Sequence, residues 1–172
     1  MEFTHLTTKE NYFVITLRKI YFCQTKSKNM KGPKELYFNI FNELIPFNKY
    51  IGLELVELSE GFAKATIKFK PELVGDSRIQ AVHGGVISAA MDAVGGIAGI
   101  TTLTSLEDKL VTVDMRVDYI RSARNTDLVI EARIVRSGNR IITTNMQVFA
   151  ASDNILVAEG RGVYHASRKK NE

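Results

Sequence analysis

The chain has 172 residues, of which 45% are hydrophobic and 24% are charged, an ordinary composition for one globular domain with a buried core. The net charge is +4, but residues 1–30 hold five basic residues against two acidic ones, so only +1 belongs to the rest of the chain. Nucleic-acid binding by the main domain therefore has no electrostatic support. The single cysteine, Cys23, excludes an internal disulfide framework and favours a reducing compartment, so we expect a cytoplasmic protein.

Residues 1–30 have no clean periodicity and run into a linker-like segment, KSKNMKGPKE. Residues 12–23 are apolar but are interrupted by Arg18 and Lys19, and no small-residue cleavage site follows, which argues against a secretory signal. We interpret residues 1–30 as an N-terminal extension that is poorly ordered or dispensable. An amphipathic helix around residues 12–22 that binds a membrane surface is the alternative.

A first helix is predicted at residues 33–46, where apolar side chains recur at helical spacing between two prolines. A hairpin is predicted next. Its first strand begins near Leu53, its turn lies at Glu60–Gly61, and its second strand, residues 62–70, alternates apolar and polar side chains. Residues 71–82 are expected to form an irregular loop.

Residues 84–103 are predicted to form a long central helix with two different faces. The broad face is bulky and apolar: Val86, Ile87, Ala90, Met91, Val94 and Ile97. The opposite face is a narrow stripe of small or polar residues: Gly85, Ser88, Asp92, Gly96 and Gly99. Each glycine inside a helix costs about 1 kcal/mol relative to alanine, so Gly95, Gly96 and Gly99 indicate that another group approaches the helix backbone closely. The helix is nearly long enough to span a membrane, but Asp92 at its middle argues against a span.

From residue 110 onward the hydrophobic pattern has period two, which predicts four strands joined by short turns, at residues 110–120, 128–135, 140–150 and 155–165. No room remains for the helices that a parallel βαβ arrangement needs. We therefore predict an α+β fold in which a five- to six-stranded antiparallel sheet wraps the central helix. The domain is expected to span residues 31–167 and to be followed by a solvated tail, residues 168–172.

Two features of the central helix could carry chemistry. Asp92 is the only ionisable residue on the small-residue stripe, so it could act as a general base on water or attack a carbonyl directly. The plainer interpretation pairs it with an arginine or with hydroxyls. The tripeptide His83-Gly84-Gly85 lies where the helix begins, and its backbone N–H groups could polarise a carbonyl oxygen. The plainer interpretation here is a glycine-rich turn with His83 as a cap.

His83 and Asp92 are nine residues apart, about 13 Å along a helix. One helix can therefore hardly bring both residues to the same carbonyl, and their cooperation would require a second subunit. The three histidines, His5, His83 and His165, are scattered and no Cys/His cluster exists, so no metal site is predicted.

Four segments in this order, VHGGVISAAMDAVGG, TVDMRVDYIRSAR, RIVRSGNR and VAEGRGVYH, resemble the hot-dog-fold acyl-CoA thioesterases of the PaaI (phenylacetate-degradation) type. The resemblance covers residues 51–165. It implies hydrolysis of an acyl-CoA to a carboxylic acid and coenzyme A, with no cofactor apart from the substrate's own coenzyme A. It also implies a homodimer in which the His-Gly pair and the aspartate of one site come from different subunits. Such dimers often pair into tetramers.

The roles of the family's residues fall on matching positions of this chain. Asp92 matches the catalytic base or nucleophile. His83-Gly84 match the pair whose glycine amide polarises the thioester carbonyl, and Thr112 matches the hydroxyl residue that orients the attacking water. The remaining matches are expected to contact the pantetheine or coenzyme A: Tyr119, Asn139, Arg140 and His165.

The chain departs from the family's pattern at Ser77, where many members have an asparagine six residues before the histidine, and Gln80 is the nearest substitute. Gly85 and Ser88 on the small-residue stripe are expected to border the substrate. Two alternative functions stay open. One is a hot-dog hydratase or dehydratase acting on an enoyl thioester, whose signature the sequence resembles less. The other is a non-catalytic module that binds acyl thioesters.

Overall fold

The computed structural model describes residue 30 and residues 32–168 of the chain. Its helices and strands, in chain order, are α2 (Lys34–Asn39), the π-helical turn η1 (Ile40–Leu44), α3 (Pro46–Ile51), β1 (Leu53–Ser59), β2 (Phe62–Ile67), the 3₁₀ turn η2 (Pro71–Leu73), β3 (Val74–Asp76), β4 (Ala81–Val82), α4 (Gly84–Ile100), β5 (Lys109–Tyr119), β6 (Leu128–Ser137), β7 (Ile141–Ala150) and β8 (Leu156–Ser167). Most of the expected N-terminal extension lies outside the described residues. Its last residue, Met30, is buried in the core and so belongs to the domain.

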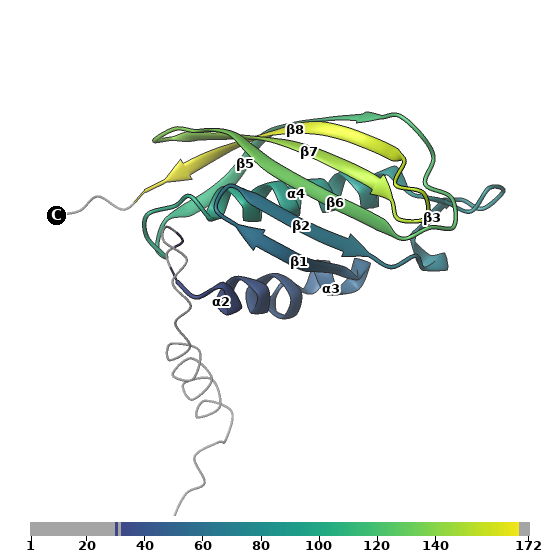
Figure 1. Cartoon of the computed structure of the whole chain (residues 1–172), viewed down its shortest axis with the longest axis horizontal. Helices are drawn as coiled ribbons and strands as arrows, with labels where there is room; N and C mark the ends of the chain where they lie inside the picture. The colour runs from purple at the N-terminus through teal and green to yellow at the C-terminus, as the bar shows by residue number, and fades with distance from the viewer. Residues whose placement is uncertain (1–29, 31, 169–172) are drawn as a thin grey trace, which may run out of the picture.

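Six strands form one antiparallel sheet in the order β1-β2-β6-β7-β8-β5, and this sheet curls around α4 (Figure 1). The predicted α+β fold, with an antiparallel sheet around a central helix, is confirmed, and the number of strands in the sheet is six. The predicted turn at Glu60–Gly61 is also confirmed. Gly61 has a φ of 72°, a left-handed conformation that glycine adopts without steric cost. The edges of the sheet are β1 and β5.

The predicted helix at residues 33–46 forms as α2 and η1, and the predicted break before Pro46 is confirmed, because η1 ends at Leu44 and Ile45 is extended. Pro46 then begins a separate helix, α3, at a position where the missing N–H of proline costs nothing. The side-chain amide of Asn48 donates to the carbonyl oxygen of Phe41 at 3.0 Å and ties α3 to η1. Gly52, with a φ of 71°, ends α3 and turns the chain into β1.

The segment 71–82, predicted to be an irregular loop, contains the short hairpin β3–β4. Its turn is held by Asp76, whose carboxylate accepts hydrogen bonds from the backbone N–H of Arg78 at 3.0 Å and from its guanidinium at 3.0 and 2.8 Å. These bonds lower the pKa of Asp76. The prediction was wrong because strands of two and three residues are too short to show a period.

The apolar face of α4 fills the inside of the curved sheet, and Ala90, Met91, Val94 and Ala98 are wholly buried. The close approach predicted at the glycines is confirmed at Gly95 and Gly99 but not at Gly96, where a Cβ would make only an ordinary contact at 3.8 Å. A Cβ on Gly95 would collide with the hydroxyl of a tyrosine from β8, and a Cβ on Gly99 would lie 2.7 Å from a leucine Cδ2 of β5. Among the described helices, none is long and apolar enough to cross a membrane.

The central helix ends at Ile100, three residues before its predicted end at Leu103. The next residue, Thr101, is buried and donates its hydroxyl hydrogen to the carbonyl oxygen of Ala98 at 2.6 Å. The same hydroxyl oxygen accepts the backbone N–H of Gly61 at 2.8 Å. Thr101 therefore terminates α4 and also fastens it to the β1–β2 turn.

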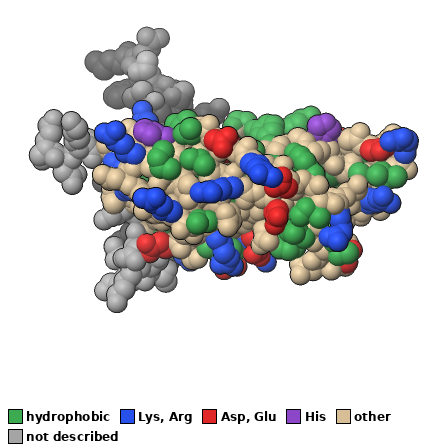
Figure 2. Space-filling model, turned by 90° about the horizontal axis from the view of Figure 1, so that it is seen from above, with side chains coloured by type: hydrophobic (Ala, Val, Ile, Leu, Met, Phe, Trp, Pro, Cys, Tyr) green, Lys and Arg blue, Asp and Glu red, His purple; other side chains and the backbone are tan. Residues whose placement is uncertain are grey.

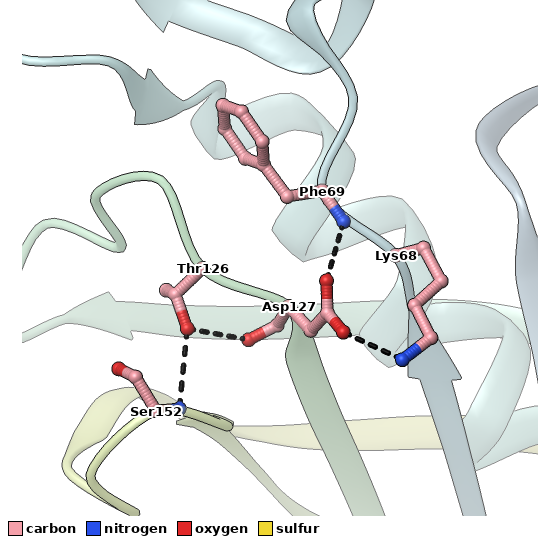
Figure 3. Close-up of polar contacts among 5 residues, drawn as sticks. All are labelled: Lys68, Phe69, Thr126, Asp127 and Ser152. Atoms are coloured by element: carbon pink, nitrogen blue, oxygen red, sulfur yellow. Dashed lines mark hydrogen bonds and ion pairs between the residues drawn. The ribbon is translucent and has the colours of Figure 1, made fainter.

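Asp127, just before β6, ties the loop after β5 to the end of β2 (Figure 3). Its carboxylate accepts hydrogen bonds from the Lys68 ammonium at 2.7 Å and from the backbone N–H of Phe69 at 2.8 Å. The hydrogen bond from Lys68 first, and then that from Phe69, lowers the pKa of Asp127. Beside it, the Thr126 hydroxyl accepts the backbone N–H of Ser152 at 3.3 Å. Three segments at this end of the sheet are thereby joined.

The outer face of the sheet, away from α4, is polar, and Figure 2 shows basic and acidic side chains interspersed over the surface seen from above. The strand register aligns these side chains in two rows that run across β5, β8, β7 and β6. The basic row contains Arg116, Arg161, Asn145 and Arg133. The acidic row contains Asp118, Glu159, Gln147 and Glu131. A hollow of about 710 Å³ lies over both rows.

Candidate active site

His83 caps the N-terminus of α4. Its Nδ1 accepts a hydrogen bond from the backbone N–H of Gly85 at 2.8 Å, so the capping role considered from the sequence is confirmed. The η2 turn and β3 pack against the backbone of His83. The N–H of His83 donates to the carbonyl oxygen of Leu73 at 2.8 Å, and a Cβ on Gly75 would lie 2.8 Å from the His83 Cα. The imidazole is exposed, and its Nδ1 is committed to the cap.

Gly84 is the first residue of α4, and its backbone N–H has no hydrogen-bond partner among the described residues. It is therefore a free donor at the positive end of the helix dipole, whereas the N–H of Gly85 is used by His83. Tyr119, at the end of β5, packs against this point. Its hydroxyl donates to the Gly84 carbonyl oxygen at 3.0 Å, and a Cβ on Gly84 would lie 3.3 Å from its ring.

A hollow of about 280 Å³ opens beside Gly84 and Tyr119. Its walls come from β4, α4 and the segment after β5 and are half polar and half apolar: Arg121 and Ser122 lie beside Ala81, Val82, Ile87, Ile120 and Ala123. A hollow of mixed polarity beside a free backbone N–H suits a ligand that has an alkyl portion, polar groups and a carbonyl oxygen.

Asp92 lies at the middle of α4 and is half-buried. The hydroxyl of Thr112, from the edge strand β5, donates to its Oδ1 at 2.8 Å. Of the two kinds of partner considered from the sequence, an arginine or a hydroxyl, the structure has the hydroxyl. No hydrogen bond or ion pair from the described residues reaches Oδ2. The carboxylate thus has one oxygen fixed and one oxygen open to a water molecule or a substrate.

The structure brings the predicted residues together in two separate groups. His83, Gly84 and Tyr119 lie at the start of α4, and Asp92 and Thr112 lie at its middle. The nine-residue separation of His83 and Asp92 along a continuous helix is about 13 Å. A single chain therefore does not offer both groups to one carbonyl.

Ser77 and Gln80, in the β3–β4 turn, are exposed and contact each other, because the Gln80 side-chain amide donates to the Ser77 carbonyl oxygen at 2.8 Å. Gln80 has a φ of 51°, an uncommon value for a residue with a side chain. Ser88, on the small-residue stripe, donates its hydroxyl hydrogen to the carbonyl oxygen of Gly85 at 3.2 Å. None of these three side chains contacts Asp92 in the described chain.

Asn139, Arg140 and His165 lie at the opposite end of α4 from His83. The Arg140 carbonyl oxygen accepts the N–H of the residue after His165 at 2.8 Å, which keeps the β6–β7 turn beside β8. Arg168 fastens the same turn: its Nε donates to the carbonyl oxygen of Asn139 at 3.1 Å. The tail expected at residues 168–172 therefore starts after Arg168 and not at it.

Tyr164, on β8, is a site residue that the sequence-based reasoning missed. It is the largest of the wholly buried side chains, and its hydroxyl donates to the backbone carbonyl oxygen of Asp92 at 3.2 Å. Gly162 could have indicated this residue from the sequence. It lies two residues earlier, on the same face of the strand, and its missing side chain leaves room for the tyrosine ring. In the described part of the chain, no three His, Cys, Asp or Glu residues gather in a way that could hold a metal ion.

A six-stranded antiparallel sheet wrapped around one long helix is the hot-dog fold. The sequence model of the thioesterase superfamily matches residues 80–157, from the β3–β4 turn to the start of β8. A protein of that superfamily with a solved X-ray structure is 33% identical, with a TM-score of 0.67 over 73% of this chain and 92% of that chain. The chain belongs to the thioesterase superfamily, whose activity is the hydrolysis of thioesters.

Two further relatives are informative. YigI of Salmonella typhimurium, a medium/long-chain acyl-CoA thioesterase, is 29% identical over 132 residues, which are 70% of this chain and 84% of YigI. The PaaI protein from the phenylacetic acid degradation operon of E. coli is 19% identical, with a TM-score of 0.66 over 80% of this chain and 91% of PaaI. At that identity, the likeness to PaaI shows the fold alone.

Proposed function

We propose that this protein hydrolyses acyl-CoA thioesters to a carboxylic acid and free coenzyme A. The observation that carries the proposal is the pair of Asp92 and Thr112, in which one carboxylate oxygen is held by a hydroxyl and the other is open. The substrate class is supported by the name of YigI, a medium/long-chain acyl-CoA thioesterase. The hollow beside Gly84, which has both polar and apolar walls, suits a pantetheine chain with its amide groups.

In the proposed reaction Asp92 acts as the general base. A water molecule gives a proton to the carboxylate while its oxygen attacks the thioester carbonyl carbon. The C–S bond then breaks, and the thiolate of coenzyme A takes up the proton. The Thr112 hydroxyl fixes the rotamer of the carboxylate, so that the open oxygen faces the water.

Direct attack by Asp92 on the thioester carbonyl is the second route open to the same residue. It forms a mixed anhydride as the C–S bond breaks and coenzyme A leaves as the thiolate, and water then hydrolyses the anhydride. A single turnover in water labelled with ¹⁸O detects this route when water attacks the aspartyl carbonyl, because ¹⁸O then appears in Asp92. General-base catalysis, like attack on the acyl carbonyl of the anhydride, puts ¹⁸O in the acid product.

The backbone N–H of Gly84 stabilises the negative charge on the carbonyl oxygen as the tetrahedral intermediate forms. It is the free donor at the start of a 17-residue helix, so both the hydrogen bond and the helix dipole favour an oxyanion there. His83 holds the glycine turn in this conformation through its bond to Gly85.

The two groups of residues meet when two copies of the chain form a dimer. Among the described residues β5 has a strand partner on one side only, and its Val111 and Val113 are 61% exposed, which supports pairing with a second strand. Thr112 and Tyr119 both lie on this strand. Antiparallel pairing of two β5 strands centred near Met115–Arg116 puts Thr112 of one chain opposite the partner's Tyr119. Each active site then takes Asp92 from one chain and Gly84 from the other.

The same two-fold symmetry makes the two α4 helices antiparallel. The end of one helix then lies near the start of the other, so that Asn139, Arg140 and His165 of one chain face a site that uses the partner's Gly84. Arg140 and His165 are suited to bind the phosphates of coenzyme A, because both side chains are exposed and can donate hydrogen bonds.

Pairing of two dimers into a tetramer is supported by the outer face of the sheet. When two copies face each other across a two-fold axis that runs between the two rows, the basic row of each copy lies opposite the acidic row of the other. Reversing the basic row with R116E, R133E and R161E is expected to leave dimers in light scattering. Tetramers that persist in this triple variant would contradict the assignment.

The test of the proposed function is a panel of acyl-CoA substrates of different chain length, with detection of the free thiol, for the wild type and the Asp92→Asn variant. The variant is expected to lose thioester cleavage while its circular dichroism and its size in solution stay unchanged. Asp153→Asn, in the exposed β7–β8 turn, is the matched control and should keep full activity. Unchanged turnover in Asp92→Asn, or binding of acyl-CoA without any turnover in the wild type, would overturn the proposal.

A further inference from the structure

Tyr164 packs against the candidate catalytic helix from the side of the sheet. Its side chain is 1% exposed, and it lies on β8 beneath α4. Its hydroxyl donates to the backbone carbonyl oxygen of Asp92 at 3.2 Å and contacts the sulfur of Met146 at 3.9 Å. In a regular helix that carbonyl oxygen already accepts the N–H four residues ahead, so the tyrosine adds a second donor from the side of the sheet.

Glycines form the space that Tyr164 occupies. A Cβ on Gly162 would lie 2.7 Å from its ring and hydroxyl, and a Cβ on Gly95 would collide with the hydroxyl. Gly96 lies over the ring edge, with its Cβ position 3.8 Å from Cε1. A glycine weakens a helix, so the place of Gly95 about one turn after Asp92 has a structural reason: it lets the tyrosine hydroxyl reach the backbone of α4.

The register of the sheet connects Tyr164 with Thr112, since the two residues are direct partners across β8 and β5. Asp92 is thus held at two atoms by two neighbouring side chains. Thr112 holds Oδ1 of the carboxylate, and Tyr164 holds the backbone carbonyl oxygen. Burial first, and then the charge of Asp92, raises the pKa of Tyr164 above its usual range, so the phenol stays protonated as a donor.

We propose that Tyr164 is a positioning residue that fixes the backbone of Asp92 against the sheet, so that the carboxylate meets Thr112 and the attacking water in one geometry. The inference rests on the proposed thioesterase function and adds a residue that does not touch the substrate. Without the hydroxyl, the backbone of this turn of α4 is held to the sheet by apolar packing and by the bond of Thr112 to the Asp92 side chain alone, and the carboxylate samples unproductive positions. The chemical step then slows while substrate binding is preserved.

The experiment compares Tyr164→Phe with Tyr37→Phe, because both remove one phenol hydroxyl from a buried ring and only the first touches Asp92. Loss of one hydrogen bond from the transition state predicts a fall in kcat of about tenfold for Tyr164→Phe, with KM within about twofold of the wild type. Tyr37→Phe should keep the wild-type kcat. Thermal unfolding of both variants, measured in parallel, separates positioning from general loss of stability.

An unchanged kcat in Tyr164→Phe would overturn the inference, and so would equal losses of kcat in the two variants or a rise in KM that accounts for the whole effect. Failure of the proposed function gives a different result, since the wild type itself then releases no thiol from any acyl-CoA. If Tyr164→Phe does not fold, Gly162→Ala is the second variant, because its Cβ would lie 2.7 Å from the ring and the hydroxyl of Tyr164 and so displaces that hydroxyl from the carbonyl oxygen of Asp92. It is expected to lower kcat without raising KM, and wild-type kinetics would overturn the inference.

Discussion

Replacing Thr112 with valine removes one hydroxyl and nearly preserves the shape of the side chain. That hydroxyl donates to Oδ1 of Asp92 at 2.8 Å. A hydrogen bond to a charged group contributes about 1.5–3 kcal/mol, and each 1.36 kcal/mol of transition-state stabilisation corresponds to a factor of about ten. We therefore expect kcat to fall roughly 10- to 100-fold. Because Thr112 is exposed in the single chain, the free energy of unfolding should change by no more than about 0.5 kcal/mol.

The assay is release of free thiol from an acyl-CoA at saturating substrate, and Thr112→Ser is the matched control because serine keeps the donor. The control should retain most of the wild-type kcat, which assigns the effect to the hydroxyl and not to any change of the β5 edge. A valine variant that turns over at the wild-type rate would refute the reasoning, as would a serine variant that loses as much activity as the valine variant.

Three further substitutions test the oxyanion donor, the packing of α4 and the pH dependence of stability. Gly84→Pro removes the backbone N–H and adds a ring at a helix position that accepts proline, so kcat should fall about 100- to 1000-fold. Gly84→Ala keeps the N–H and adds only the Cβ, which lies 3.3 Å from the Tyr119 ring, so its kcat should fall far less; equal kcat in the two would contradict the oxyanion role. Gly95→Ala should lower the free energy of unfolding by about 3 kcal/mol, because its Cβ collides with the side chains beneath α4, and Gly96→Ala should not; equal urea midpoints would contradict this. The hydrogen bond from Lys68 lowers the pKa of Asp127 in the folded protein below its unfolded-state pKa of about 3.9. The stabilisation that this hydrogen bond gives the fold is therefore present above the unfolded-state pKa, and it is lost as the pH falls through the lower folded-state pKa. The urea midpoint of the wild type should therefore exceed that of Asp127→Asn at pH 7 and converge with it at strongly acidic pH, and a constant gap would contradict the sign.

Long periodic patterns made the architecture predictable. The two-faced helix at residues 84–103 and the period of two from residue 110 onward indicate an antiparallel sheet around one helix, and the structure has both. Short segments were the failures. The strands β3 and β4 are shorter than the window in which a period can be seen, and the short helix α3 that begins at Pro46 was not predicted.

The candidate site was less predictable than the fold. The small-residue stripe singled out Asp92 on physical grounds, but its contact with Thr112, twenty residues away, follows from no spacing rule and was reached only through the family resemblance. Tyr164 was not found at all, because its role depends on cross-strand register and on glycines from two different elements. The residue pattern along one strand or helix carries no information about such contacts.

The most direct test of the shared active site mixes two inactive chains, Asp92→Asn and Gly84→Pro. If each site takes Gly84 from one chain and Asp92 from its partner, a mixed dimer has one intact site and one site with both defects. Random pairing of equal amounts should then restore about a quarter of the wild-type rate per chain, although each variant alone is inactive. If Gly84 and Asp92 of the same chain served one site, every site in the mixture would be defective and no activity would return.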